Sequence, residues 1–169
     1  HIGCIQIMGN VTLCLNGHTI TVKANREAFK IAKSVSTPSS TLTLTDCQGG
    51  GQITHDPSSL GNGVNLSENC NFIMYGGSIT GNSVSGSGGG VYVSAQDGTQ
   101  GRFVMYGGSI TGNNASSFGS GGVCVYGTMT VSGSVRITDN VNRGSKDDSG
   151  IYTGSTASNV RLVDRTTIT

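Results

Sequence analysis

The nine acidic residues are the groups with which this chain could cleave a polysaccharide, and only two of them are adjacent. These are Asp147 and Asp148, in a polar stretch, residues 142–149, that also contains Arg143 and Lys146. A hydrolase with two carboxylates needs them about 5 to 10 Å apart across a cleft, which neighbours on one loop rarely provide. Asp147 and Asp148 are therefore weak catalytic candidates, and the sequence favours a non-catalytic protein over an enzyme.

Metal-binding and cofactor motifs are missing from the sequence. Its five cysteines include no CxxC pair and have no histidine at ligand spacing, so zinc is not expected. The glycines at 88–90 are not followed by the aspartate of calcium-binding nonapeptide repeats, which leaves a structural calcium ion unsupported. We therefore expect no cofactor.

Tyrosines are the candidates for ligand binding. Tyr75 and Tyr106 occupy the same position in two copies of a repeat, and Tyr92 and Tyr152 occupy another position two copies apart. Columns of aromatic rings can hold sugar rings, although packing between neighbouring strands is the alternative. Tyr75, Tyr106 and Tyr92 are our candidate glycan-binding residues.

The repeat that places these tyrosines is nearly exact. Residues 72–82, FIMYGGSITGN, return as residues 103–113, FVMYGGSITGN, with ten of eleven positions identical and a period of 31. No helical periodicity runs through either copy. A repeat of this length predicts a solenoid, in which each unit stacks on the next because one unit cannot bury a core alone.

Weaker copies extend the repeat over most of the chain. An Ile-Thr step recurs, with the isoleucine at 20, 53, 79, 110, 137 and 168. A short apolar pair precedes each step: Leu13/Leu15, Leu42/Leu44, Phe72/Met74, Phe103/Met105, Met129/Val131 and Val160/Leu162. A third apolar run follows in most copies, at Phe29/Ile31, Val64/Leu66, Val91/Val93, Val123/Val125 and then Ile151. Three short strands in each unit predict a right-handed parallel β-helix of about five coils.

Stacked coils bring equivalent residues above one another. We expect Ile53, Ile79, Ile110 and Ile137 to form an aliphatic column inside the solenoid. Asn82, Asn113 and Asn140 follow the Ile-Thr step at one offset, and we interpret them as an internal ladder of side-chain amides. The outward residues beside each isoleucine are mostly Thr and Ser, a regular hydroxyl-rich face typical of strand surfaces and also of ice-binding arrays.

Two local features stay open. Residues 25–33 fit a short helix that caps the solenoid, with Asn25 as N-cap, and fit a strand equally well. Disulfides between neighbouring coils are open for the five cysteines, with Cys47 and Cys70 near corners, but thiols that only fill space are the favoured interpretation. Alternation predicts outward side chains for Cys14 and Cys124.

Composition and charge limit the partners. The net charge is +1 and only 11% of residues are charged, so we expect no nucleic acid. No apolar run is long enough to span a membrane, and we expect no membrane insertion of this segment. We interpret residues 1–169 as one β-helix domain, a fragment of a longer surface protein, because both ends fall within strands of the repeat.

The segment 79–82, ITGN, followed by 88–92, GGGVY, resembles the FxxN and GGA[ILV] repeats of bacterial polymorphic outer-membrane proteins. It is also similar to β-helix repeats in large surface proteins of gut Gram-positive bacteria. The resemblance covers about residues 10–169 and implies an exported right-handed parallel β-helix with an adhesin-like role. It implies no catalytic residues, because the signatures of the enzymes with this fold are not matched.

We therefore expect a non-catalytic stalk or adhesin segment, extracellular or on a cell surface, whose loops or tyrosine column bind glycans or proteins. A polysaccharide lyase or glycoside hydrolase of the pectate-lyase-like fold is the alternative. End-to-end self-association into filaments, through unpaired strand edges at the ends of the solenoid, and ice binding are further alternatives.

Overall fold

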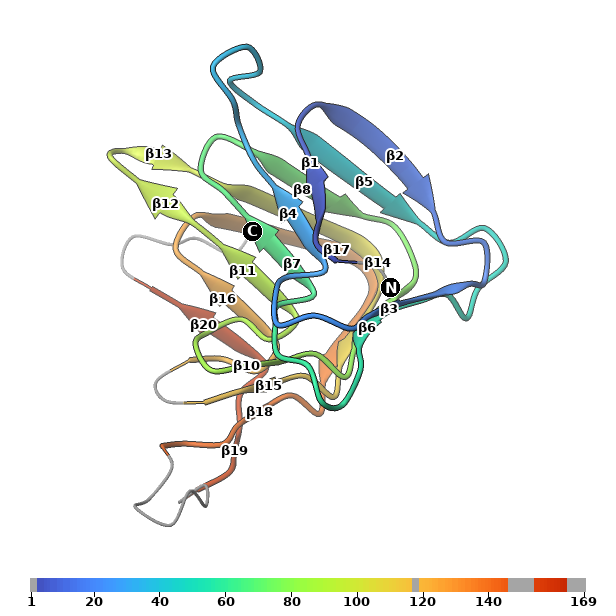
Figure 1. Ribbon diagram of the computed structural model, residues 1–169, viewed down its shortest axis with the longest axis vertical. Coiled ribbons are helices and arrows are strands. Elements are labelled where there is room, and N and C mark those ends of the chain that lie inside the picture. Colours follow the sequence, from blue (N-terminus) through green and yellow to red (C-terminus); the bar gives the residue numbers. More distant parts are fainter. Residues whose placement is uncertain (1–2, 117–118, 146–153, 164–169) are drawn as a thin grey trace.

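The chain forms an all-β solenoid with parallel strands stacked in about four turns, each called a coil here. The computed structural model describes residues 3–116, 119–145 and 154–163, and among them there is no helix. Figure 1 shows the stacks following the chain from blue through green and yellow to red. The predicted fold class is confirmed.

The stacked strands form three faces. The first face contains β2 (Asn10–Cys14), β5 (Thr41–Thr45), β8 (Asn71–Met74) and the first halves of β14 (Arg102–Thr111) and β17 (Thr128–Thr138). The second face contains β3 (Thr19–Val22), β6 (Gln52–His55), β9 (Ser78–Thr80) and the second halves of β14 and β17. The third face contains β1 (Ile5–Ile7), β4 (Phe29–Ile31), β7 (Val64–Leu66), β11 (Val91–Val93), β16 (Val123–Val125) and β20 (Val160–Leu162).

Shorter strands occupy the corners. Between the second and third faces, β10 (Ser83–Val84), β15 (Asn114–Ala115), β18 (Val141–Asn142) and β19 (Thr156–Ala157) form a small sheet, in which only the β18–β19 pair is antiparallel. A hairpin of β12 (Ala95–Gln96) and β13 (Thr99–Gln100) projects between the third and first faces.

The core is a set of columns that the parallel register aligns. Ile20, Ile53, Ile79, Ile110 and Ile137 are register partners along the second face, and the middle three are fully buried. On the first face the rings of Phe72 and Phe103 are stacked, with centroids 5.0 Å apart and planes 10° from parallel. Each column continues in the next coil, so the stacking of coils makes one hydrophobic core.

The structure decides between the two alternatives for residues 25–33 and corrects the place of Val160 and Leu162. Residues 25–33 form no helix: Phe29–Ile31 is β4, with both apolar side chains buried and Lys30 between them. The pair Val160/Leu162 lies on the third face, in register with Val123/Val125, rather than in the column of the first-face apolar pairs. Before β20 joins the third face, β19 pairs antiparallel with β18 in the corner sheet.

The register of β2 also differs from the expected one. Val11 and Leu13, rather than Leu13 and Leu15, pair with Leu42 and Leu44. Leu15 is nevertheless buried, beyond the end of β2, where the chain turns towards the second face. The shift of two residues keeps the alternation of side chains intact, so the sequence pattern alone did not reveal it.

Candidate functional site

A Tyr-Gly-Gly corner positions the two tyrosines of the first face. Tyr75 follows β8 directly, and Tyr106 lies at the equivalent place within β14. Two residues later Gly77 and Gly108 have φ values of 81° and 86°, a conformation that favours glycine. A Cβ added to Gly108 would lie 2.6 Å from the carbonyl oxygen of Gly77, so consecutive corners are in close contact and their tyrosines are aligned.

The aligned tyrosines form an exposed stacked pair. Their ring centroids are 5.0 Å apart with planes 19° from parallel, and Tyr75 and Tyr106 are 54% and 42% exposed. They are among the few large side chains with apolar surface that the structure leaves in solvent. A pair of this kind is an attractive contact for the apolar face of a sugar ring, since each ring is rigid and carries a polar hydroxyl.

Small residues flank the tyrosine pair along the stack. The N–H of Tyr75 donates to the carbonyl of Leu44, which aligns Tyr75 with Thr45 of the preceding coil. On the other side the register shifts after the Met105–Val131 pair, so that Ser132 and Gly133 together lie opposite Tyr106. The column neighbours of the tyrosine pair are small residues, Thr45 on one side and Ser132 with Gly133 on the other.

The third face carries a second tyrosine contact. Tyr92 on β11 lies next to Tyr126, with ring centroids 5.6 Å apart and planes tilted by 49°. Both residues are half-buried, and burial raises the pKa of the Tyr92 hydroxyl. Tyr126 was missed in the sequence, because it lies one position beyond the apolar pair of its run, whereas Tyr92 lies inside its run. Tyr152 lies outside the described residues.

The free cysteines are not activated nucleophiles. Cys4, Cys70 and Cys124 are unpaired, and burial raises the pKa of each thiol. A thiol held in its protonated form is a poor nucleophile. Cys124 points away from the core, as the alternation predicts. It is nevertheless fully buried, so the side chain does not face solvent. Its hydrogen bond with Ser87 shows that a corner loop covers this part of the third face.

The amide ladder lies inside the corner between the second and third faces. The Nδ2 groups of Asn82 and Asn113 donate to the Oδ1 atoms of Asn113 and Asn140, both at 2.9 Å. The same Oδ1 atoms accept the backbone N–H groups of Asn82 and Asn113. Asn159, which the repeat spacing did not indicate, extends the ladder by accepting from Asn140. All three predicted members are fully buried, so they support the corner and contact no ligand.

The hydroxyl-rich outer surface of the second face is in register, and some of its hydroxyls form hydrogen bonds within the protein. Thr21, Thr54, Thr80, Thr111 and Thr138 form one column. Ser109 donates to Ser78, and Thr138 donates to Asp139. Arg136 interrupts the neighbouring column and forms an ion pair with Asp139 at 3.1 Å.

A cleft lies beside the small corner sheet. It has a volume of about 240 Å³ and is lined by residues of several coils, among them Asp56, Leu60, Ser83, Asn114 and Arg143. The Asp56 carboxylate accepts the N–H and O–H of Ser58, and these hydrogen bonds lower its pKa. Asp147 and Asp148 lie outside the described residues. In the part of the chain that the structure describes, no three His, Cys, Asp or Glu side chains gather to hold a metal ion.

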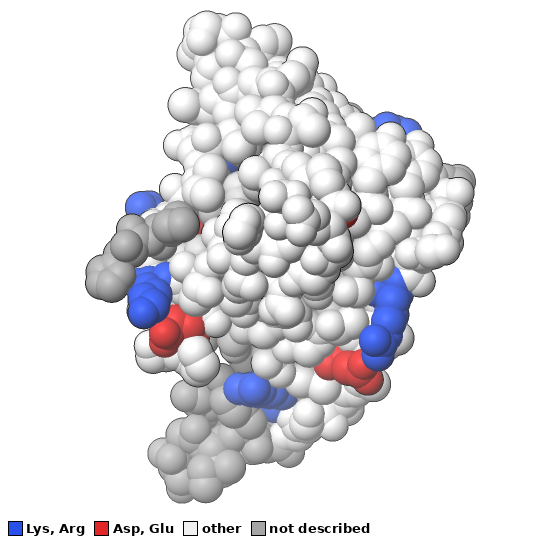
Figure 2. Space-filling model, turned by 90° about the vertical axis from the view of Figure 1, so that its right-hand side faces the viewer, with Lys and Arg blue, Asp and Glu red and all other residues white. Residues whose placement is uncertain are grey.

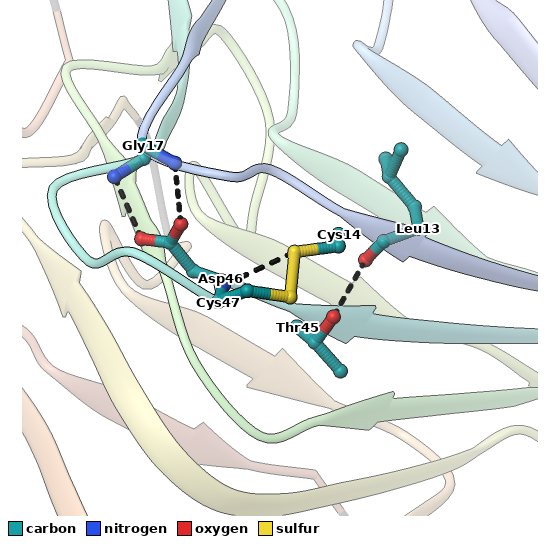
Figure 3. Close-up of a disulfide and its surroundings, with 7 residues drawn as sticks. Leu13, Cys14, Gly17, Thr45, Asp46 and Cys47 are labelled. Carbon is teal, nitrogen blue, oxygen red and sulfur yellow. Dashed lines mark hydrogen bonds between the residues drawn. A yellow bond between two sulfur atoms is a disulfide. The ribbon is translucent and has the colours of Figure 1, made fainter.

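A disulfide and a carboxylate cross-link the first two coils at one corner (Figure 3). Cys14, next in register to Thr45, is bonded to Cys47, which corrects the interpretation that these thiols only fill space. Beside the disulfide, Asp46 accepts the N–H groups of Gly17 and Gly51, both at 2.7 Å. These hydrogen bonds, the one from Gly17 foremost, lower the pKa of Asp46.

Charge is sparse on the side of the molecule drawn in Figure 2. The coloured side chains lie in small groups near the margins, with acidic groups next to basic ones. In the described residues no helix is long and apolar enough to cross a membrane. Comparison with protein-family models, with curated proteins and with solved structures finds no match for this chain.

Proposed function

We propose that this chain is a non-catalytic, extracellular stalk or adhesin segment that binds glycans through the tyrosine pair of the first face. The observation that carries the proposal is the exposed stack of Tyr75 and Tyr106. A sugar ring placed against the exposed surface of these rings would bury apolar surface. Hydroxyls of both tyrosines would supply the polar contacts.

The Cys14–Cys47 disulfide supports the extracellular part of the proposal. Disulfides persist in oxidising compartments and at cell surfaces and are rare in the cytosol of mesophiles. The resemblance to repeats of bacterial surface proteins points the same way. The solenoid itself suits display, because its coils form a stiff rod from which the corner loops and the hairpin project.

The test is a glycan array combined with a polysaccharide-cleavage screen on the 169-residue chain, with and without calcium. We expect binding without turnover. Tyr75→Ala and Tyr106→Ala should each weaken binding by about tenfold, a loss of about 1.4 kcal/mol. Tyr75→Phe keeps the ring face and should retain most of the affinity.

Tyr126→Ala is the matched control, because it removes a tyrosine from the other aromatic contact. Its binding should equal that of the unmodified protein. Turnover of any polymer would contradict the non-catalytic proposal. Equal losses from the Tyr75 and Tyr126 substitutions would remove the assignment of binding to the first face.

A further inference from the structure

The cleft beside the small corner sheet, called the corner cleft here, contains a buried hydroxyl that is open to a ligand. Ser59 lines this cleft and is only 7% exposed. Its backbone N–H donates to the carbonyl of Asp56, but its hydroxyl forms no hydrogen bond with any described residue. Every fully enclosed side-chain nitrogen and oxygen in that part of the chain has a partner, so the Ser59 hydroxyl must open into the cleft.

Other polar groups line the corner cleft in the same state. Both hydrogen bonds from Ser58 end on Oδ1 of Asp56, so Oδ2 accepts none from the described residues. The half-buried side chains of Ser83 and Asn114 also form none within the described part of the chain. The cleft therefore offers one carboxylate oxygen that only accepts, together with hydroxyls and an amide that both donate and accept.

An apolar side chain separates the corner cleft from a second hollow. Leu60 is 44% exposed and lines both the cleft and a hollow of about 310 Å³, where Asn62 and Ser85 are among the other lining residues. The backbone N–H of Leu60 donates to Oδ1 of Asn25 at 2.9 Å, which fixes this position against the preceding coil. A ligand longer than one ring can therefore continue from the cleft across Leu60 into the second hollow.

The inner wall of the corner cleft is held by contacts with the coils on both sides. The ring nitrogens of His55 lie 2.7 Å from Oδ1 of Asn82 and 2.7 Å from the carbonyl oxygen of Arg26, so the ring continues the amide ladder by one member. The N–H of Gly61 donates to the carbonyl of Ser83 in the following coil. The cleft is thus formed before a ligand arrives, which lowers the entropic cost of binding.

We infer that the corner cleft is a second glycan-binding site, which takes one neutral sugar ring while the next ring of the same glycan lies across Leu60. Adjacent hydroxyls of the sugar would donate to Oδ2 of Asp56 and accept from the amide of Asn114. The volume of about 240 Å³ is below the range of about 300 to 1,000 Å³ for drug-sized ligands, which suits a single ring. This site stands apart from the tyrosine pair of the first face and does not depend on it.

The charges and the backbone of the corner cleft argue against other ligands. Hydrogen bonds from Ser58 lower the pKa of Asp56, so this carboxylate is negative at neutral pH and disfavours an anion. Arg143 lines the same cleft, and its positive charge beside a single carboxylate disfavours a metal cation. A peptide strand would need unpaired main-chain groups along β10, where the carbonyl of Ser83 already accepts from Gly61. Neutral hydroxyl groups fit this combination best.

The test is ¹H–¹⁵N NMR of the 169-residue chain during titration with glucose, mannose, galactose and N-acetylglucosamine, and with a disaccharide of each. At least one of these sugars should shift the amide signals of residues 56–62, 83 and 114, and its disaccharide should bind more tightly. Shifts confined to the surroundings of Tyr75 and Tyr106 would leave the first-face site standing and overturn the cleft site. Binding in the cleft of galacturonic acid alone, the anionic probe, would also overturn the inference.

Two substitutions test the polar groups of the cleft directly. Ser59→Ala and Asn114→Ala should each raise the dissociation constant of the sugar about two- to tenfold, the effect of one neutral hydrogen bond. Neither side chain forms a hydrogen bond with a described residue, so both variants should fold normally. Ser132→Ala, at an exposed serine of the first face, is the matched control, and Tyr75→Ala should leave binding in the cleft unchanged. Unchanged affinity in Ser59→Ala and Asn114→Ala would overturn the inference.

Discussion

The central coils and the N-terminal coils of this solenoid are stabilised in different ways. Between β8 and β18 the same residue types stack from coil to coil, as in the phenylalanine pair, the tyrosine pair and the asparagine ladder. The first two coils depart from the repeat. They are joined by the Cys14–Cys47 disulfide, the Asp46 carboxylate and the His55 ring, each of which occurs once in the described part of the chain.

This difference shows what exact repetition provides. When two coils have identical residues, one hydrogen-bond pattern satisfies every copy, and each asparagine serves its neighbours on both sides. When the sequence of a coil diverges, that shared pattern ends, and bonds fitted to one place connect the coils instead. The following predictions test whether the two regions depend on these separate devices.

Asn113→Ala should have the largest effect, because it interrupts the ladder in the middle. The backbone N–H of Asn82 loses its acceptor inside the protein, and the carbonyls of Ile79 and Thr111 lose the Nδ2 donor of Asn113. Leaving buried polar groups unpaired costs about 1 to 3 kcal/mol each, so the free energy of unfolding should fall by about 4 kcal/mol in urea denaturation. The neighbouring Asn114→Ala, at the lining of the corner cleft, is the control and should cost less than about 1 kcal/mol. Equal effects of the two substitutions would contradict the ladder's importance.

Removal of the Cys14–Cys47 disulfide should cause the second-largest fall in the free energy of unfolding, and the loss should affect the N-terminal coils. The bond closes a loop with a sequence separation of 33. Loop-closure entropy predicts a stabilisation of about 3 to 4 kcal/mol, which a reductant should remove. In the double variant Cys14→Ser, Cys47→Ser the reductant should change nothing further. A reductant effect that persists in this variant would show that another thiol is involved.

Asp46→Asn should have a smaller effect that depends on pH. The folded-state pKa of Asp46 is lowered by the N–H groups of Gly17 and Gly51, so its stabilisation is present above the unfolded value of about 3.9 and is lost as the pH falls through the folded one. Denaturation from pH 6 down to pH 2.5 should show a shallower acid-induced loss in Asp46→Asn. Asp97→Asn, in the β12–β13 hairpin, is the control and should match the unmodified protein.

The tyrosine pair should contribute least to stability. Aromatic pairs add about 0.5 to 1.5 kcal/mol, and exposure of these two rings favours the low end. A double-mutant cycle with Tyr75→Ala and Tyr106→Ala should give a coupling energy of about 0.5 kcal/mol in unfolding. A coupling above about 2 kcal/mol would show that the pair is a structural element.

The fold could be predicted from the repeat, because the period alone places equivalent residues of successive coils above one another. The alternating apolar pairs and the Ile-Thr step therefore led to the fold class and to parallel stacking. Cross-links that occur once leave no periodic signal. A prediction of the disulfide would have required the true register of β2, in which Cys14 lies opposite Thr45.

Two further residues escaped prediction for the same reason. Asn159 enters the ladder after only 19 residues rather than a full repeat, because the chain reaches it through the antiparallel β18–β19 pair. His55 differs from asparagine in type and in spacing, so no residue pattern connects it with the ladder. Both residues lie next to the ladder only in the folded protein, and their spacing along the chain does not match the repeat.

The ladder also gives assembly a direction. Each asparagine donates its backbone N–H to the amide oxygen of the coil that follows it in the chain: Asn82 to Asn113, Asn113 to Asn140 and Asn140 to Asn159. The asparagine of a coil at the C-terminal end of a growing stack therefore keeps an unpaired backbone N–H until the next coil packs against it. In a chain synthesised from its N-terminus, each new coil would supply the amide oxygen that accepts the N–H of the coil before it.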